Sequence, residues 1–180
     1  YGGGTNVSGA LAVPTSESRM ATSVDMRRMN RIVELDEENF QARIEAGISG
    51  KQLENALNER GYTSGHDPDS LEFSTLGGWI ATNASGMKKN RYGNIEEIVL
   101  EATLITPTGD VETKHVTPRN STGIQPRSFL FGSEGNFGII SKAVIKIHPT
   151  PAARKYGLLI FPTFERGVEF LRALRVTGTI

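Results

Sequence analysis

The sequence predicts an α+β fold, and three observations lead to that prediction. Segments with alternating apolar and polar residues indicate strands, a segment with a capping motif indicates a helix, and the two kinds follow one another without regular βαβα alternation. Glycine is the unusual residue, at 20 of 180 residues, against a usual share of about 7%. Because these glycines gather in three clusters, we expect the functional residues to lie there.

Two strands and a helix are expected first. Residues 31–36 and 40–45 flank a polar turn, and the second segment alternates apolar and polar side chains as a half-buried strand does. Ser49 and Gln52 then have the spacing of a capping box. This spacing predicts a helix that begins after Ser49 and ends at Gly61.

Shorter elements follow. Residues 75–83 are apolar and rich in small side chains, which favours a short helix. Residues 97–106 and 111–116 are expected to be strands joined by a turn that contains Pro and Gly. A short helix is predicted over 126–131 and a long strand over 139–148, where alternate residues are apolar.

A second unit is predicted after two helix-breaking prolines near residue 150. Residues 156–161 are expected to form an apolar strand, and residues 163–174 a helix with an apolar face. We therefore divide the chain into a domain of residues 1–153 and the start of another at 154–180. The chain opens at Tyr1 without Met and runs straight into a triple glycine, so we expect a segment of a longer protein.

Composition excludes several classes of function. The 20 basic residues balance the 20 acidic residues, whereas nucleic-acid-binding proteins usually carry a basic excess. There is no Cys, which excludes disulfides, thiolate metal sites and a cysteine nucleophile. The longest apolar stretches are far shorter than the roughly 18 residues that span a bilayer.

The first glycine cluster covers residues 2–9. Successive glycines let backbone N–H groups turn to one side and bind an anion such as a phosphate, and Thr5, Asn6 and Ser8 add donors. A flexible linker is an equal alternative from these residues alone. The cluster is not a Rossmann fingerprint, because Val7 stands where the third glycine belongs.

The second cluster covers residues 66–86. A polar loop leads to Ser74 and Thr75 at a helix start, where free N–H groups would favour an anionic or carbonyl ligand. The small residues that follow would let a flat group pack against the backbone; they are Gly77, Gly78, Ala81 and Ala84. The alternative is a capped helix packed closely on a sheet. No metal site is expected, because His66 and its acidic neighbours match no usual ligand spacing.

The third cluster covers residues 132–140, where a glycine recurs every third residue before a strand. Such a backbone could hydrogen-bond the edge of a heterocycle. From these residues alone, an irregular turn before an edge strand is the favoured interpretation. The basic run at 87–91 indicates a solvated turn, given the neutral balance of the chain.

Taken together, three segments resemble a known family. They are GGGTNVSGAL, GHDPDSLEFSTLGGWIATNASGMKKNRYGNIEEIV and GSEGNFGIISKAVIKIHPTP. In this order, and over essentially the whole chain, they are similar to the PCMH-type FAD-binding domain of the vanillyl-alcohol-oxidase flavoprotein family. HDPDSLEFST and SGMKKNRYGNIE resemble the ether-lipid-forming branch, whereas D-lactate and glycolate dehydrogenases share only the glycine skeleton.

The resemblance implies cofactor contacts in three segments. Residues 1–6 would form the pyrophosphate loop, residues 69–75 and 82–85 would line the diphosphate and flavin, and residues 134–140 would hold the adenine-side half. Individually these are Tyr1, Gly2, Gly3, Gly4, Thr5, Asn6, Asp69, Ser70, Leu71, Glu72, Phe73, Ser74, Thr75, Thr82, Asn83, Ala84, Ser85, Glu134, Gly135, Asn136, Phe137, Gly138, Ile139 and Ile140.

The resemblance also implies a reaction. The acyl chain of acyl-dihydroxyacetone phosphate would be exchanged for a fatty alcohol, with the flavin as covalent carrier and no net redox change. Covalent relatives place a His in the pyrophosphate loop, where this chain has Thr5 and Asn6, so FAD is expected to be non-covalent. Earlier βα elements, most of a cap domain that begins near residue 154, and the family's acid/base residues would lie outside this chain.

Other expectations accompany this one. The substrates would be lipids; peripheral membrane association through other regions and a homodimer are compatible with the resemblance. The location would be peroxisomal or glycosomal in a eukaryote and cytoplasmic in a bacterium. Two alternatives stay open: an FAD-linked dehydrogenase of a 2-hydroxy acid such as D-lactate or glycolate, and a non-enzymatic cofactor-binding module.

His66 is the candidate catalytic residue, because a histidine in a motif-bearing loop can exchange protons near neutral pH. It would assist the main acid/base groups or hold the substrate phosphate. The favoured alternative is that it orders the loop through hydrogen bonds to Asp67 or Asp69. His115 and His148 are expected at the surface.

Overall fold

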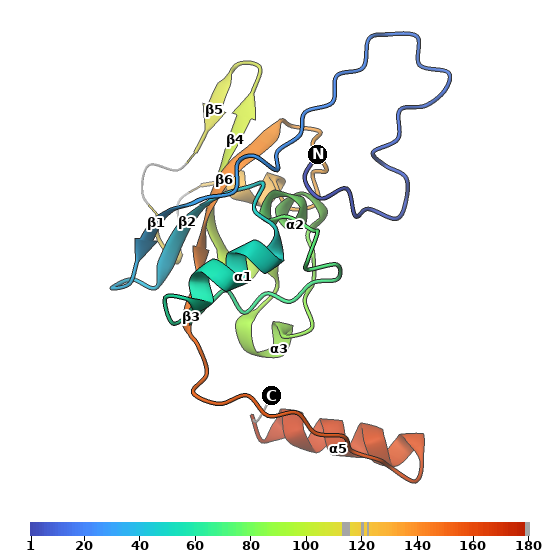
Figure 1. Ribbon diagram of the computed structural model, residues 1–180, viewed down its shortest axis with the longest axis vertical. Helices are drawn as coiled ribbons and strands as arrows, with labels where there is room; N and C mark the ends of the chain where they lie inside the picture. Colours follow the sequence, from blue (N-terminus) through green and yellow to red (C-terminus); the bar gives the residue numbers. More distant parts are fainter. Residues whose placement is uncertain (113–115, 120, 122, 179–180) are drawn as a thin grey trace. The chain divides into compact units, whose positions relative to one another are not determined.

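The computed structural model describes residues 1–112, 116–119, 121 and 123–178. The chain separates into two compact units, Tyr1–Pro149 and Thr150–Ile180, which are described one at a time. Most elements of both are labelled in Figure 1. A mixed α+β architecture, as the sequence predicts, is present in the first unit.

The first unit is built on an antiparallel sheet of five strands in the order β1-β2-β6-β4-β5 (Figure 1). A second, two-stranded antiparallel sheet pairs β3 with β7. The strands are β1 Ile32–Asp36, β2 Gln41–Glu45, β3 Tyr62–Thr63, β4 Val99–Thr106, β5 Gly109–Val111, β6 Ile139–Lys146 and β7 His148–Pro149.

Short helices accompany the sheet: α1 Gly50–Asn58, α2 Leu76–Thr82, α3 Lys89–Tyr92, α4 Ile95–Ile98 and the 3₁₀ helix η1 Pro126–Phe129. The capping box that opens α1 is confirmed. The Ser49 hydroxyl accepts the Gln52 N–H at 3.3 Å, and the Gln52 side chain accepts the Ser49 N–H at 3.2 Å. None of the helices in the described residues is long and apolar enough to cross a membrane.

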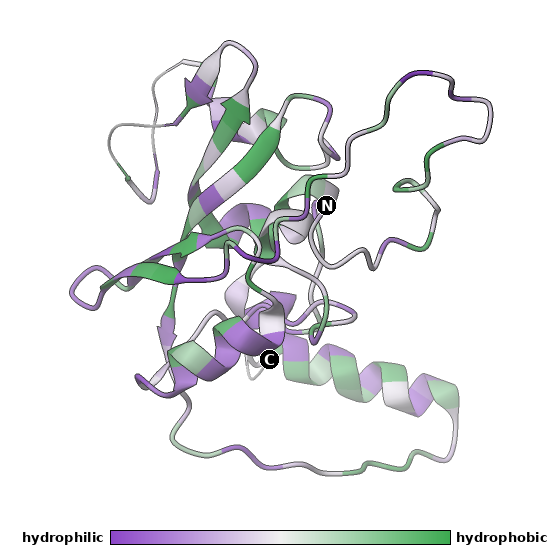
Figure 2. Ribbon diagram, turned by 45° about the horizontal axis from the view of Figure 1, so that its top comes forward, coloured by the Kyte–Doolittle hydropathy of each residue, from purple (hydrophilic) through white to green (hydrophobic). Residues whose placement is uncertain are grey.

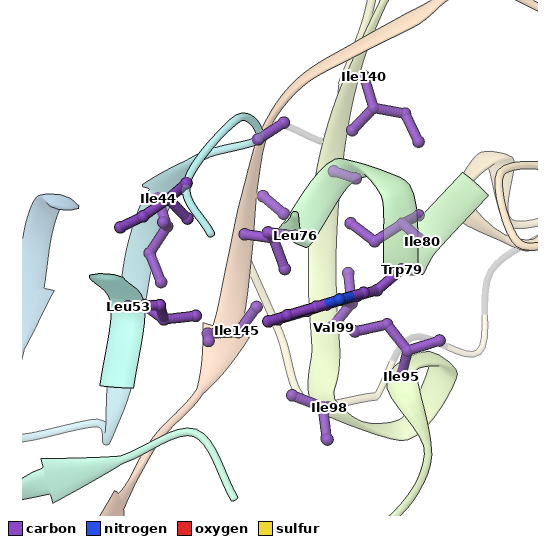
Figure 3. Close-up of a cluster of buried hydrophobic side chains, with 14 of the residues drawn as sticks. Ile44, Leu53, Leu76, Trp79, Ile80, Ile95, Ile98, Val99, Ile140 and Ile145 are labelled. Carbon is purple, nitrogen blue, oxygen red and sulfur yellow. The ribbon is translucent and has the colours of Figure 1, made fainter. Parts of the chain in front are cut away.

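One hydrophobic core joins the helices to one face of the sheet. Figure 3 shows Leu53 of α1 and Leu76 and Trp79 of α2 beside Ile44 of β2 and Ile145 of β6. All five are nearly or fully buried. The core therefore fixes α2 against the central strands, which matters because α2 carries the middle glycine cluster.

Two expected strands have different limits. The strand expected over 97–106 begins at Val99, because Asn94 and Glu97 form a capping box and start the single turn α4. The strand expected over 139–148 ends at Lys146, and His148 pairs with Thr63 instead.

Two further expectations concern this region. His148 is half-buried against Tyr92, with ring centroids 5.0 Å apart, so its expected surface position is wrong. Part of the strand expected over 111–116, including His115, lies outside the described residues.

The second unit contains one regular element in its described part, helix α5 Phe164–Val176, which the Thr163 hydroxyl caps. Apolar and polar residues alternate along α5 (Figure 2). The strand expected over 156–161 is wrong. That segment has no pairing strand among the described residues, and its side chains are exposed, with Tyr156 at 87%. The functional division at residue 153 stays a prediction.

Candidate functional site

The three glycine clusters meet at one pocket of about 890 Å³ in the first unit. Most residues assigned to the cofactor from the resemblance line it. They are Tyr1, Gly2, Gly3, Gly4, Thr5, Asn6, Asp69, Ser70, Ser74, Thr75, Thr82, Ala84, Ser85, Glu134, Gly135, Asn136, Gly138, Ile139 and Ile140.

The first cluster lies directly on the second. A Cβ atom at Gly2 would overlap the Thr75 hydroxyl, and one at Gly3 would overlap the backbone carbonyl of Phe73. Protein interiors do not tolerate such overlap, so the chain must shift if either glycine gains a side chain. Gly2 and Gly3 are therefore packed against the second cluster rather than part of a flexible linker, whereas Gly4 is exposed and has no such neighbour.

The start of α2 differs from the expectation of free N–H groups. The Leu76 N–H donates to the Ile48 carbonyl at 3.1 Å, and the Gly77 N–H donates to the Ala46 carbonyl at 2.7 Å. The Gly78 N–H donates to the Thr75 hydroxyl at 3.4 Å. The loop that follows β2 accepts two of these N–H groups and the Thr75 side chain accepts the third, so the expectation that they are free for a ligand is wrong.

Small residues on α2 and just after its end form one wall of the pocket. Gly77, Gly78, Ala81 and Ala84 all line it, as the expected packing surface for a flat group requires. A Cβ at Gly77 would lie 2.9 Å from the Cβ of Ala46, closer than real contacts allow. Glycine at this position lets α2 approach the end of β2.

The third cluster is tied to the end of α2. The Glu134 N–H donates to the Ala81 carbonyl at 2.9 Å, and the Gly132 N–H donates to the Ile80 carbonyl at 3.3 Å. Glu134 and Asn83 both have a left-handed backbone, with φ of 46° and 51°, which is uncommon outside glycine. Tertiary hydrogen bonds hold this turn, and the strand that follows it, β6, pairs with both β2 and β4, so the expectation of an irregular turn before an edge strand is wrong.

Five assigned residues lie outside the pocket lining. Leu71 packs over Gly50, Phe73 faces solvent and offers its carbonyl to the Gly3 contact, and Glu72 is exposed. Asn83 ends α2. Phe137 lines a separate apolar cavity of about 310 Å³ with Phe129 and is not among the residues that line this pocket, so its contact with the cofactor stays a prediction.

The sequence analysis also missed pocket residues. They are Val7, Ala10, Leu11, Met26, Ala46, Pro68 and Trp79. Met26 reaches the pocket because its N–H donates to the Tyr1 carbonyl at 2.9 Å. No local sequence pattern predicts a contact between residues that are 25 positions apart.

His66 lies behind the pocket wall and not in its lining. Its ring packs edge-on against Trp79 at 5.1 Å between centroids, and the side chain is 3% exposed. Burial lowers the pKa of His66 to about 4, although the Asp67 carboxylate opposes the shift. Neither ring nitrogen has a hydrogen-bond partner among the described residues, so the expected bonds to Asp67 or Asp69 are wrong. Its catalytic role stays a prediction.

Few ionisable side chains line the described pocket: Asp69, Glu134 and the Tyr1 phenol. Among the residues that the structure describes, no group of three His, Asp or Glu could hold a metal ion. The wall consists largely of backbone and small side chains. Such a surface can hold a flat group and hydrogen-bond its edges, and it offers little for acid/base chemistry.

Comparison with known proteins agrees with this geometry. Residues 1–114 match the family model described as FAD binding domain. The alkyldihydroxyacetonephosphate synthase of Caenorhabditis elegans is 46% identical over 97% of this chain and 29% of its own length. A solved structure of an alkyldihydroxyacetonephosphate synthase superposes with a TM-score of 0.91 and 44% identity, over 100% of this chain and 32% of that one.

A mitochondrial D-lactate dehydrogenase of Saccharomyces cerevisiae is less similar, at 31% identity over 99% of this chain and 30% of its own length. The chain spans about a third of the length of these relatives.

The buried neutral His66 predicts a specific pH dependence of stability. The unfolded chain regains a pKa near 6.5, so it binds a proton that the folded state does not. The free energy of unfolding should therefore fall between pH 6.5 and 4, by roughly 1.4 kcal/mol per pH unit from this group. Chemical denaturation of the wild type and His66→Gln at pH 7 and pH 5 measures the difference, and the other titrating groups cancel. Equal losses in both proteins would contradict it.

Proposed function

This chain belongs to the FAD binding domain family, and from that premise we propose that it is the cofactor-binding part of an ether-lipid synthase. The proposed reaction joins acyl-dihydroxyacetone phosphate and a fatty alcohol. The fatty acid leaves as its ester bond breaks, the alcohol oxygen forms the ether bond, and the products are alkyl-dihydroxyacetone phosphate and the free acid. No electrons are gained or lost overall.

The pocket fits FAD. Its volume of about 890 Å³ lies within the usual range for small-molecule and cofactor sites, roughly 300–1,000 Å³. Gly2 and Gly3 hold the N-terminal backbone against Thr75 and Phe73 beside the pocket, and successive glycines can turn their N–H groups toward an anion such as a diphosphate. Residues 1–6 would hold the diphosphate, and the small residues of α2 would pack against a flat ring.

Sequence similarity carries the choice of reaction. Three alkyldihydroxyacetonephosphate synthases are 43–46% identical over 92–99% of the chain, whereas the oxidoreductases of the same fold are 28–34% identical. The difference supports the ether-lipid branch over a 2-hydroxy-acid dehydrogenase. A peroxisomal or glycosomal location, membrane association and a homodimer stay predictions.

The residues of this chain would bind and orient rather than transfer protons. When bound, the flavin supplies a covalent carrier atom, so that the exchange needs no net oxidant or reductant. The backbone of the three clusters would fix the ring system, and the apolar wall beneath it would exclude water. Asp69 and Glu134 are the carboxylates at the pocket, and the main acid/base groups are expected in other parts of the protein.

Thr75→Ile should abolish FAD binding. The Thr75 hydroxyl caps α2 and lies against Gly2, so its loss costs about 1 kcal/mol of helix stability, and the larger side chain displaces the glycine loop. Visible absorbance per protein measures FAD content. Thr75→Ser keeps the hydroxyl and serves as the control. Equal FAD content in the isoleucine variant and the wild type would refute this placement of Thr75.

FAD should be bound without a covalent link. The chain contains no Cys, and among the described residues no His lines the pocket. Acid precipitation of the holoprotein should release all of its yellow flavin into the supernatant. Flavin fluorescence that stays with the denatured chain on a gel would show that the link is covalent.

Product analysis tests the proposed reaction. The full-length protein should convert acyl-dihydroxyacetone phosphate and a deuterated fatty alcohol into a deuterated ether, detected by mass spectrometry. The matched control omits the alcohol. Reduction of an electron-accepting dye by D-lactate or glycolate, with no ether formed, would contradict the proposal and favour the dehydrogenase alternative.

A further inference from the structure

Trp79 is the single tryptophan of the chain. Its indole N–H forms a hydrogen bond to one residue that lines the pocket, Ser74. Nε1 donates to the Ser74 hydroxyl over 2.9 Å, and both side chains are buried, at 3% and 7% exposure. The Ser74 hydroxyl in turn donates to the Asp69 carbonyl over 3.2 Å. A relay of two hydrogen bonds therefore runs from α2 to the loop that carries the cofactor residues.

This relay changes the role of Ser74. A serine hydroxyl has one proton to donate, and here that proton goes to Asp69. The Ser74 side chain is thus not a donor for a diphosphate, although sequence analysis counted Ser74 among the cofactor contacts. Instead, the hydroxyl bridges the two ends of the loop at residues 69–74 through its hydrogen bond to the Asp69 carbonyl.

The loop that the relay closes is under backbone strain. Ser70 has a left-handed φ of 53°, which a residue with a Cβ rarely adopts. The Phe73 and Ser74 N–H groups both donate to the Ser70 carbonyl, at 2.9 and 2.8 Å. The same loop presents the Phe73 carbonyl to Gly3. A shift in this turn would therefore move the glycine loop as well.

The indole itself is held firmly. His66 packs edge-on against it, and a Cβ at Gly50 would lie 2.8 Å from its Cζ2 atom. Figure 3 shows the ring lying in the core between Ile145 and Ile80. A donor fixed in this way is preorganised, as supporting residues of a functional site need to be.

We propose that Trp79 is a positioning residue for the cofactor: through its bond to Ser74 it holds the turn at residues 69–75 in the shape that FAD requires. The inference rests on the proposed FAD site. It assigns to the Trp79 N–H a function beyond filling the core, and it places Ser74 in the loop's support rather than among the ligands.

A double-mutant cycle of Trp79→Phe and Ser74→Ala in the full chain tests the proposal. Trp79→Phe removes one buried hydrogen bond and should raise the dissociation constant for FAD about tenfold. Ser74→Ala removes the same bond and also the bond to the Asp69 carbonyl, so its effect should be at least as large. The double variant should be little worse than Ser74→Ala, because Trp79→Phe then has no further hydrogen bond to remove. Tyr62→Phe is the matched control, since it removes an aromatic donor, bonded to Glu37, outside the pocket.

Amide hydrogen exchange of the apoprotein gives a second readout that needs no FAD. Exchange at residues 69–75 should be faster in Trp79→Phe and Ser74→Ala than in the wild type and Tyr62→Phe. Additive effects on FAD affinity, or unchanged exchange in this peptide, would reduce Trp79 to a packing residue and overturn the proposal. A wild-type chain that takes up no FAD would instead contradict the proposed function, and the exchange comparison would still decide whether the relay orders the loop.

Discussion

The pocket depends on one close contact, in which the backbone of Gly2 and Gly3 lies against the Thr75 side chain and the Phe73 carbonyl. Neither glycine has room for a Cβ, so the N-terminal loop can pack against the second cluster only while both positions are glycine. The second cluster is in turn held by the carbonyls of Ala46 and Ile48 at the end of β2. The sheet, α2 and the glycine loop therefore form one continuous support.

The same support explains why the pocket contains little chemistry of its own. Most hydrogen-bonding groups near α2 are used within the protein, and the few ionisable side chains at the wall are carboxylates and a phenol. A wall of this kind positions a cofactor that carries its own reactivity. We propose that the substrate-binding and acid/base groups lie outside this chain, which spans about a third of the length of its relatives.

Structural features that depend on neighbouring residues could be predicted from the sequence, whereas features that depend on contacts between distant segments could not. The Ser49–Gln52 capping box depends on four consecutive residues and was predicted correctly. The apolar run at 156–161 suggested a strand, but a strand also needs a partner, which no local pattern reports. Likewise, only the fold shows that Phe137 faces a second cavity and that His66 is buried behind Trp79. The distribution of glycines identified the three clusters, the resemblance assigned them to a cofactor, and packing decided which side chains face the pocket.

The most direct measurement is FAD affinity of Gly3→Ala compared with Gly157→Ala. Gly157 has open space around its Cα and no left-handed backbone, so it reports the effect of an alanine without overlap. The account predicts that Gly3→Ala raises the dissociation constant for FAD by about tenfold or more, since the added methyl would overlap the Phe73 carbonyl, while Gly157→Ala leaves it unchanged. Equal affinities of the two variants and the wild type would contradict the account.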